Sequence, residues 1–214
     1  MTRDAFYSDN DAFVCRWLER LIGAGRLPYG RVAECDINAI SPAELGAYRE
    51  CHFFAGIGGW PYALRLAGWP RDREVWTGSC PCQPLSRAGR RQGHADERHL
   101  WPAFYRLIAE CRPATIVGEQ VAGNPGCEWL SGVRADLEKL GYAIGAADLP
   151  AACEGAPHAR QRLFWCASTN TVSKRRSGTS LEFRRPSLEY AVIEFKRKGS
   201  VVGVVAPLKQ PRAR

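Results

Sequence analysis

The sequence has no run of apolar residues long enough to cross a membrane, which takes about 18 or more in succession. Its first twenty residues carry acidic side chains at four positions and lack the apolar segment of a secretory signal peptide. We therefore expect a cytoplasmic protein with no membrane partner.

The sequence also lacks the cysteine pattern of a disulfide-bonded protein. The nine cysteines are odd in number and scattered along the chain, whereas a disulfide framework is typical of short secreted proteins. Cys80 and Cys82 are not followed by a second closely spaced Cys or His pair that would complete a tetrahedral zinc site. The sequence predicts free thiols and no metal.

The net charge of +8 is concentrated at one end of the chain. Residues 168–214 hold 11 basic and 3 acidic side chains, so residues 1–167 are neutral as a whole. Such a tail can bind nucleic-acid phosphates by releasing counterions, or it can be a solvated, disordered appendage. The sequence leaves both interpretations open.

With 214 residues and 45% hydrophobic content, the chain is long enough for one domain with a core. We divide it into an N-terminal helix and connector (1–50), a central domain (51–167) that holds the motifs described below, and a basic, flexible tail (168–214). The helix is predicted over 12–22, where apolar residues recur at helical spacing before Gly23. From Cys51 onwards, short apolar runs alternate with helical patterns, which favours an α/β fold with a parallel sheet covered by helices. We expect strands at 51–55, 74–78, 114–118, 142–148 and 162–167, and helices at 61–67, 99–110 and 128–140.

Two segments combine turn residues with reactive or flexible ones. His52–Gly59 is a glycine-rich turn between a predicted strand and a helix, and it lacks the Gly-Lys-Ser/Thr of a phosphate loop. By itself it fits a structural turn as well as a cofactor loop. Thr77–Ser86 ends a strand in Pro-Cys-Gln, which would expose the Cys82 thiol at the carboxyl edge of the sheet, where parallel sheets bind ligands.

Two further segments bring charge to the same region. Glu119 lies in an apolar strand, and Arg160 and Arg162 are spaced to share a face if they begin a strand. Taken singly, an ordinary strand-end acid and a surface charge pair are the favoured interpretations.

In their order along the chain, these segments resemble the motifs of the DNA (cytosine-5) methyltransferases, most closely the compact forms carried by bacteriophages and prophages. The resemblance covers about residues 51–167. It is carried by Phe54-Ala-Gly-Ile-Gly-Gly59, Pro81-Cys-Gln83, Glu119-Gln-Val121, His158-x-Arg160-x-Arg162 and, less directly, Ala95–Trp101. It implies a Rossmann-like, abbreviated S-adenosylmethionine-dependent methyltransferase sheet in a bacterial or phage-infected cell, with a place in restriction-modification.

The resemblance also implies residue roles. Phe54 would lie against the adenine of S-adenosyl-L-methionine. The other cofactor contacts would come from the turn, at Ala55, Gly56, Gly58 and Gly59, and from the backbone of Pro81 and Leu100. Cys82 would attack carbon 6 of a cytosine flipped out of double-stranded DNA, since that atom is inaccessible in the stack. Glu119 would hold ring nitrogen 3 and the amine, and Arg162 the carbonyl oxygen. Three residues would contact the base surroundings or phosphate: Arg160, Gln83 and Ser86.

Several features depart from the family pattern. Only 28 residues separate Phe54 from Cys82, about one βαβ unit. This interval omits the acid expected to bind the cofactor ribose, for which the candidates are Asp72, Glu74, Glu34 and Asp36. His158 stands where glutamine is usual and Gln120 where asparagine is usual, and the family's C-terminal motifs have no counterpart. We expect the N-terminal helix to substitute for that missing packing element.

Three alternatives to an active DNA enzyme remain at this stage. A tRNA cytosine-5 methyltransferase would use the same motifs. A degenerate, non-catalytic DNA-binding protein would retain them without activity. A complementing second chain would supply the missing half; otherwise we expect a monomer.

Overall fold

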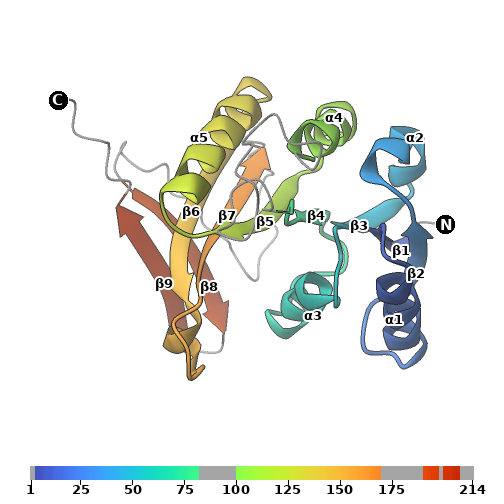
Figure 1. The fold of residues 1–214 in the computed structure, drawn as a ribbon, viewed down its shortest axis with the longest axis horizontal. Helices are drawn as coiled ribbons and strands as arrows, with labels where there is room; N and C mark the ends of the chain where they lie inside the picture. Colours follow the sequence, from blue (N-terminus) through green and yellow to red (C-terminus); the bar gives the residue numbers. More distant parts are fainter. Residues whose placement is uncertain (1–2, 82–99, 170–189, 198–199, 208–214) are drawn as a thin grey trace.

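A computed structural model describes residues 3–81, 100–169, 190–197 and 200–207, the last two ranges by backbone alone. A seven-stranded sheet with the order β2-β1-β3-β4-β5-β7-β6 forms the centre of the molecule (Figure 1). Its strands are β1 (Arg3–Asp9), β2 (Gly30–Glu34), β3 (Tyr48–Phe53), β4 (Val75–Gly78), β5 (Thr115–Val121), β6 (Tyr142–Pro150) and β7 (Gln161–Thr169).

Helices cover both faces of the sheet. One layer contains α1 (Ala12–Gly23) and α3 (Gly59–Leu66), and the opposite layer contains α2 (Pro42–Leu45), α4 (Trp101–Cys111) and α5 (Asn124–Lys139) (Figure 1). Two short 3₁₀ helices, η1 (Ile37–Ala39) and η3 (Ala151–Glu154), lie in the connections. None of the helices in the described ranges is long and apolar enough to span a membrane.

The N-terminal segment belongs to the sheet. β1 pairs in parallel with β2 on one side and β3 on the other, so that β1, α1 and β2 form a βαβ unit ahead of the glycine-rich turn. Asp11 caps α1, with its side chain accepting from the Phe13 amide at 2.7 Å. The expected helix over 12–22 is confirmed, whereas β1 was missed and β2 lies in what we interpreted as a connector.

The placement of α1 differs in part from the expectation. The helix packs on β1 and β2, with Cys15 and Leu18 buried, where we expected it to pack at the motif-bearing strands. It also reaches the 54–59 turn, where the Trp17 indole donates to the Ile57 carbonyl at 3.3 Å. The expected shortening between the turn and the Pro-Cys-Gln segment is present, with α3 as the helix between β3 and β4, and the neighbouring sheet positions are filled by β1 and β2.

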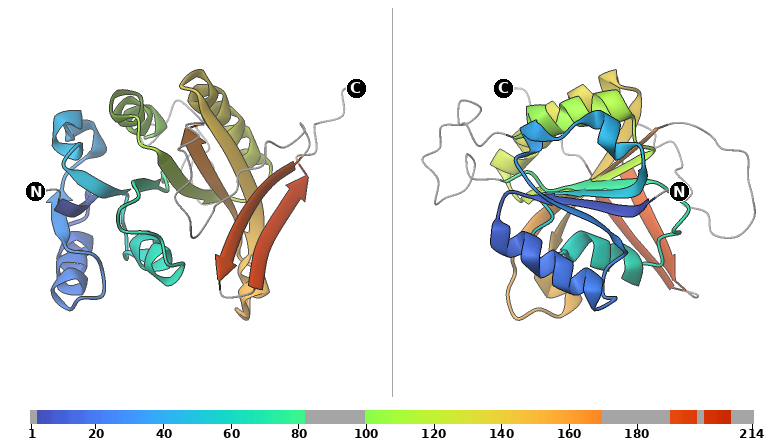
Figure 2. Two further views of the ribbon diagram at one scale, coloured as in Figure 1. Left: turned by 180° about the vertical axis from the view of Figure 1, so that it is seen from behind. Right: turned by 90° about the vertical axis from the view of Figure 1, so that its right-hand side faces the viewer.

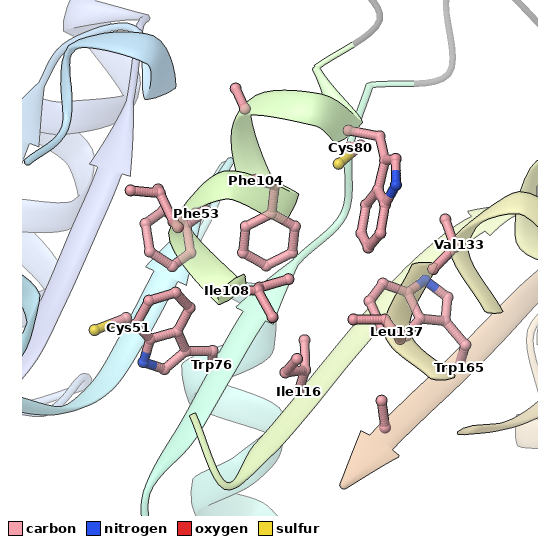
Figure 3. Packing of buried hydrophobic residues seen from close by; sticks show 14 of the residues in the cluster. Cys51, Phe53, Trp76, Cys80, Phe104, Ile108, Ile116, Val133, Leu137 and Trp165 are labelled. Carbon is pink, nitrogen blue, oxygen red and sulfur yellow. The ribbon is translucent and has the colours of Figure 1, made fainter. Parts of the chain in front are cut away.

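The main core lies between the sheet and the layer of α2, α4 and α5 (Figure 3). Phe53 and Trp76 pack together, and Phe53 also packs against Phe104 of α4; each large side chain buried in this way contributes roughly 1.5–3 kcal/mol. Glycines allow the close approach: a Cβ at Gly78 would lie 2.4 Å from Phe104, and one at Gly118 2.4 Å from Trp165. The ends of β4 and β5 are thereby fixed against α4 and β7.

The C-terminal half differs from the expected parallel sheet. β1, β3, β4 and β5 are parallel, but β7 runs antiparallel to both β5 and β6. No crossover helix joins β6 to β7, only η3 and a turn, and a parallel pair needs a longer connection. Beyond them, β8 (Tyr190–Arg197) and β9 (Ser200–Pro207) form a hairpin beside β6, where we expected a flexible tail (Figure 2).

Candidate active site

The carboxyl ends of four parallel strands bring the sequence motifs together. β1 ends at Asp9, β3 leads into Phe54, β4 leads through Ser79 to Pro81, and β5 ends just beyond Glu119. Ligands of open α/β sheets bind at this edge, outside the carboxyl ends of the strands. The fold therefore places the candidate cofactor turn beside the segment that leads to Cys82.

The turn at 54–59 has a constrained backbone. Phe54, Gly56 and Gly58 have φ of 52°, 53° and 80°, in the left-handed region that a non-glycine residue seldom adopts. The Ala55 amide donates to the Ser8 carbonyl at 3.1 Å, which ties the turn to the end of β1. The Phe54 ring is half-buried and meets Phe104 edge to face at 6.3 Å. Strain of this kind is commonly found at functional sites.

The glycines of the turn face different surroundings. A Cβ at Gly58 would lie 2.9 Å from Leu27 and 3.3 Å from Leu18, so Gly58 faces the core beneath α1 rather than an open ligand side. This corrects its predicted role of admitting the cofactor. A Cβ at Gly59 would meet no atom within 4 Å, and one at Gly56 only the Phe54 carbonyl oxygen, at 3.9 Å. The open side of the turn is the side of Gly56 and Gly59.

Asp9 is a site residue that the sequence interpretation missed. Its Oδ2 accepts the Gly56 amide at 3.0 Å, and its Oδ1 accepts the Asp11 amide at 3.1 Å. The recognisable signal was a short apolar stretch, residues 5–7, followed by an acid and by the capping Asp11 of an amphipathic helix. Together these indicate a strand that ends in a carboxylate at the start of a βα turn.

The acids that we considered instead are placed differently. Asp72 and Glu74 precede β4 and lie at the opposite, amino edge of the sheet, where the Glu74 carboxylate accepts the Ala114 amide at 3.0 Å. Glu34 and Asp36 lie at and just beyond the end of β2, which β1 separates from β3. The Asp36 side chain accepts the Asn38 amide at 2.7 Å and so caps η1. Asp9 is the acid that contacts the turn.

Glu119 and Arg162 form an ion pair at the edge of the sheet. Arg162 Nε lies 2.5 Å from Glu119 Oε1, and both side chains are about one quarter exposed, at 29% and 27%. Burial raises the pKa of the Glu119 carboxyl above its usual value, and this outweighs the lowering by Arg162 and Arg160. Its carboxylate oxygens have further lone pairs with which to accept hydrogen bonds from a ligand.

Arg160 does not share the strand position of Arg162. It precedes β7, is exposed and has a φ of 25°, while its carbonyl oxygen accepts the Ala151 amide at 3.3 Å. Arg160 therefore lies just outside the strand on which a common face was predicted, although it contributes to the field at Glu119 together with Arg162. Leu100 forms the N-cap of α4 and is half-buried, and Pro81 is exposed.

The candidate nucleophile Cys82 and the residues Gln83 and Ser86 lie outside the described residues. Cys80, two positions earlier, is buried in the main core, and burial raises the pKa of its thiol far above the usual value. A thiol whose ionisation is disfavoured is a poor nucleophile, so Cys80 has the surroundings of a structural cysteine. Among the described residues, no group of three or more His, Cys, Asp or Glu is arranged to hold a metal ion.

Comparison with known proteins identifies the family. The C-5 cytosine-specific DNA methylase family matches residues 68–200, well over half of the chain. The chain belongs to this family. The matched region begins after the 54–59 turn, so the assignment of the turn and of Asp9 depends on the geometry described above.

Relatives and solved structures agree with this assignment. The chain is 34% identical over 93 residues to the type II methyltransferase M.AplI of Arthrospira platensis, covering 42% of this chain and 27% of the relative. It is 27% identical over 152 residues to M.NlaX of Neisseria lactamica, covering 67% and 48%. The chain thus spans between about a quarter and a half of the length of these relatives.

Two solved structures establish the fold. Spodoptera frugiperda DNMT2 has a TM-score of 0.52 at 16% identity, over 81% of this chain and 45% of its own. The Entamoeba histolytica methyltransferase EhMeth has a TM-score of 0.52 at 14% identity, over 83% and 56%. The predicted Rossmann-like methyltransferase fold is confirmed.

Proposed function

We propose that this member of the cytosine-specific family methylates carbon 5 of cytosine in DNA, with S-adenosylmethionine as the methyl donor and Cys82 as the nucleophile. The observation that carries the proposal is the Glu119–Arg162 pair at the carboxyl edge, beside the strand end that leads through Pro81 to Cys82. A partly buried acid and a guanidinium held together in this way match the polar edge of a cytosine ring, which offers both donors and acceptors.

The residues around the turn fit S-adenosylmethionine. The turn has an open side at Gly56 and Gly59, a half-buried aromatic ring in Phe54 and a carboxylate in Asp9. Each Asp9 oxygen accepts one amide, so lone pairs remain for the hydroxyls of a ribose. We assign the ribose contact to Asp9, the adenine contact to Phe54 and backbone contacts to Ala55, Pro81 and Leu100. The cofactor would supply an electrophilic methyl group.

The chemistry at the base is assigned to the chain's own residues. The Cys82 thiolate adds to carbon 6 of the flipped cytosine, which makes carbon 5 nucleophilic. Glu119 holds ring nitrogen 3 and the amine and offsets the charge that develops as sulfur adds, and Arg162 holds the carbonyl oxygen. After methyl transfer, carbon 5 loses its proton to water, the 5,6 double bond re-forms, and the Cys82 thiolate leaves carbon 6. Arg160, Gln83 and Ser86 are proposed to contact the phosphate or the base surroundings.

The test is covalent trapping on DNA that carries 5-fluorocytosine. Fluorine replaces the proton that carbon 5 must lose, so an active enzyme stalls as an adduct that survives denaturing electrophoresis. We expect the adduct to depend on S-adenosylmethionine, to vanish in Cys82→Ser and to persist in Cys80→Ser. Glu119→Gln should slow trapping by roughly 10²–10³-fold, the usual loss on removing one charge-stabilising group.

Three outcomes would contradict the proposal. An adduct lost in Cys80→Ser but retained in Cys82→Ser would reverse the assignment of the nucleophile. Trapping on tRNA and not on DNA would identify the other substrate. No trapping by a folded chain that binds the cofactor would indicate a degenerate protein or one that needs a complementing chain.

A further inference from the structure

Trp60 lies where the cofactor turn meets the two strands of the proposed base site. It is the second residue of α3, directly after the 54–59 turn. Its indole Nε1–H donates to Ser79 Oγ at 2.9 Å, and its ring meets Phe164 of β7 edge to face at 6.1 Å and 82°. A single side chain therefore contacts both the segment that follows β4 and the strand that carries Arg162.

Ser79 accepts a second hydrogen bond at the same oxygen. The backbone amide of Glu119 donates to Ser79 Oγ at 3.2 Å. A hydroxyl oxygen has two lone pairs, and these two donors use both. Since Ser79 lies three residues before Cys82, one oxygen joins the cofactor helix, the nucleophile segment and the strand of the catalytic acid.

The hydrogen bond from the Glu119 amide to Ser79 lies just beyond the last backbone-paired residues of β4 and β5. β4 and β5 pair through Trp76 with Ile116 and Thr77 with Val117, and β4 ends at Gly78. Beyond that point, the Glu119 amide donates to a side chain instead of to a carbonyl of β4. Phe164, the other contact of Trp60, is the residue opposite Glu119 in β7. The position of the Glu119 backbone thus depends on Ser79 from one side and on a strand braced by Trp60 from the other.

We propose that Trp60 and Ser79 are positioning residues that link the cofactor turn to Glu119 and hold the backbone of this acid in place. We call these two residues the Trp60–Ser79 bridge. The inference rests on the proposed function, since it concerns the rate of that reaction. Neither residue is assigned a contact with the reacting atoms. The bridge acts through the placement of the groups that do, and small displacements of such groups lower rates strongly.

The test compares single-turnover methylation rates at saturating cofactor and DNA. Ser79→Ala and Trp60→Phe each remove the bridge, and the second keeps an aromatic ring against Phe164. We expect each to lower the rate about tenfold, the effect of one missing hydrogen bond at the upper end of the usual range. Dissociation constants for cofactor and DNA should be unchanged. The double variant should be no slower than Ser79→Ala, and Ser79→Thr should retain most of the rate.

A matched control and a second measurement complete the test. Trp69→Phe removes an indole donor of the same kind, to the Arg73 carbonyl at 3.0 Å, beyond the far end of α3. It should leave the rate unchanged. Amide hydrogen exchange of Glu119 should accelerate in Ser79→Ala and not in Trp69→Phe, whether or not the chain is active.

The outcomes separate the two proposals. Rates at the wild-type level in both bridge variants of an active enzyme would overturn the inference, as would unchanged exchange at Glu119 in Ser79→Ala. A parallel rise in the dissociation constants together with a slower rate would indicate general damage and would also overturn it. A wild-type chain that binds the cofactor but does not methylate DNA would refute the proposed function, whereas the exchange measurement would still decide the bridge.

Discussion

The two halves of the strand order, one on each side of the site, are formed from the chain in different ways. On the proposed base side, β4 leads towards the Pro-Cys-Gln segment, β5 contains Glu119 and β7 contains Arg162, and each motif is recognisable in the sequence. On the cofactor side, β2, β1 and β3 are formed from residues 3–53, and the carboxylate that meets the turn precedes Gly56 by 47 positions.

The difference shows that a site at the edge of a parallel sheet depends on strand order in space, not on strand order in the chain. β1 can stand beside β3 although α1, β2, η1 and α2 lie between them in sequence, because its carboxyl end still reaches the same edge. The sheet positions beside the turn are therefore filled in this fold, even though the interval between the turn and the Pro-Cys-Gln segment is short.

The largest expected difference between the effects on cofactor binding and on DNA binding comes from the variant Gly59→Leu. The new side chain would enter the open side of the turn, where a Cβ meets no atom within 4 Å, and Gly59 lies in an ordinary helical conformation at the start of α3. We expect the variant to fold and to lose S-adenosylmethionine binding in calorimetry, while its affinity for DNA is unchanged.

Two controls make that prediction sharper. Gly46→Leu places the same side chain in open space far from the turn and should bind the cofactor normally. Gly58→Val should instead lower the melting temperature, because Gly58 has a φ of 80° and faces Leu27 and Leu18. Normal cofactor binding by Gly59→Leu would show that the ligand does not lie on this side of the turn.

A smaller effect is expected from Asp9→Asn. The amide oxygen can still accept the Gly56 amide, but one acceptor and the negative charge are removed. We expect cofactor affinity to fall about 10–100-fold, as is usual for hydrogen bonds to a charged group, with DNA affinity retained. Asp11→Asn, two residues away, should leave both affinities intact because asparagine also caps helices well. Equal cofactor affinity in Asp9→Asn and the wild type would exclude the ribose contact.

How much of this could be predicted from the sequence differs between the two sides. The strands and α-helices between residues 51 and 169 were predicted to within a few residues, because buried strands such as β5 are continuous apolar runs bounded by turns, whereas β8 and β9 were not predicted. The family resemblance assigned Glu119 and Arg162 to one base site, but it did not predict the ion pair between them. The antiparallel course of β7 was missed, since the alternation of strands and helices does not show where a crossover helix is absent.

The missed strands have a physical explanation. β2 is an edge strand whose side chains are half-buried or exposed, so that it lacks an apolar pattern. β1 is buried only over its short middle, and charged residues flank it at Arg3, Asp4 and Asp9. No periodicity indicates that such a strand inserts between two others, and Asp9 could not be assigned without the sheet order.

The smallest expected effect concerns the basic C-terminal region, which we propose adds sequence-independent DNA affinity to the base side. Substitution of Lys174, Arg175 and Arg176 by glutamine removes three of the 11 basic residues in 168–214 without shortening the chain. The slope of log affinity against log salt should become shallower by about 0.9 for each phosphate that the variant no longer neutralises. Truncation after Thr169 keeps all of β7 and should flatten the slope further. Cofactor affinity serves as the control, because β4, β5 and β7 separate β3, which leads into the turn, from β6 and its neighbouring hairpin. If all three chains give the same slope, the basic residues are a solvated appendage, and the affinity for DNA comes from the edge that carries Glu119 and Arg162.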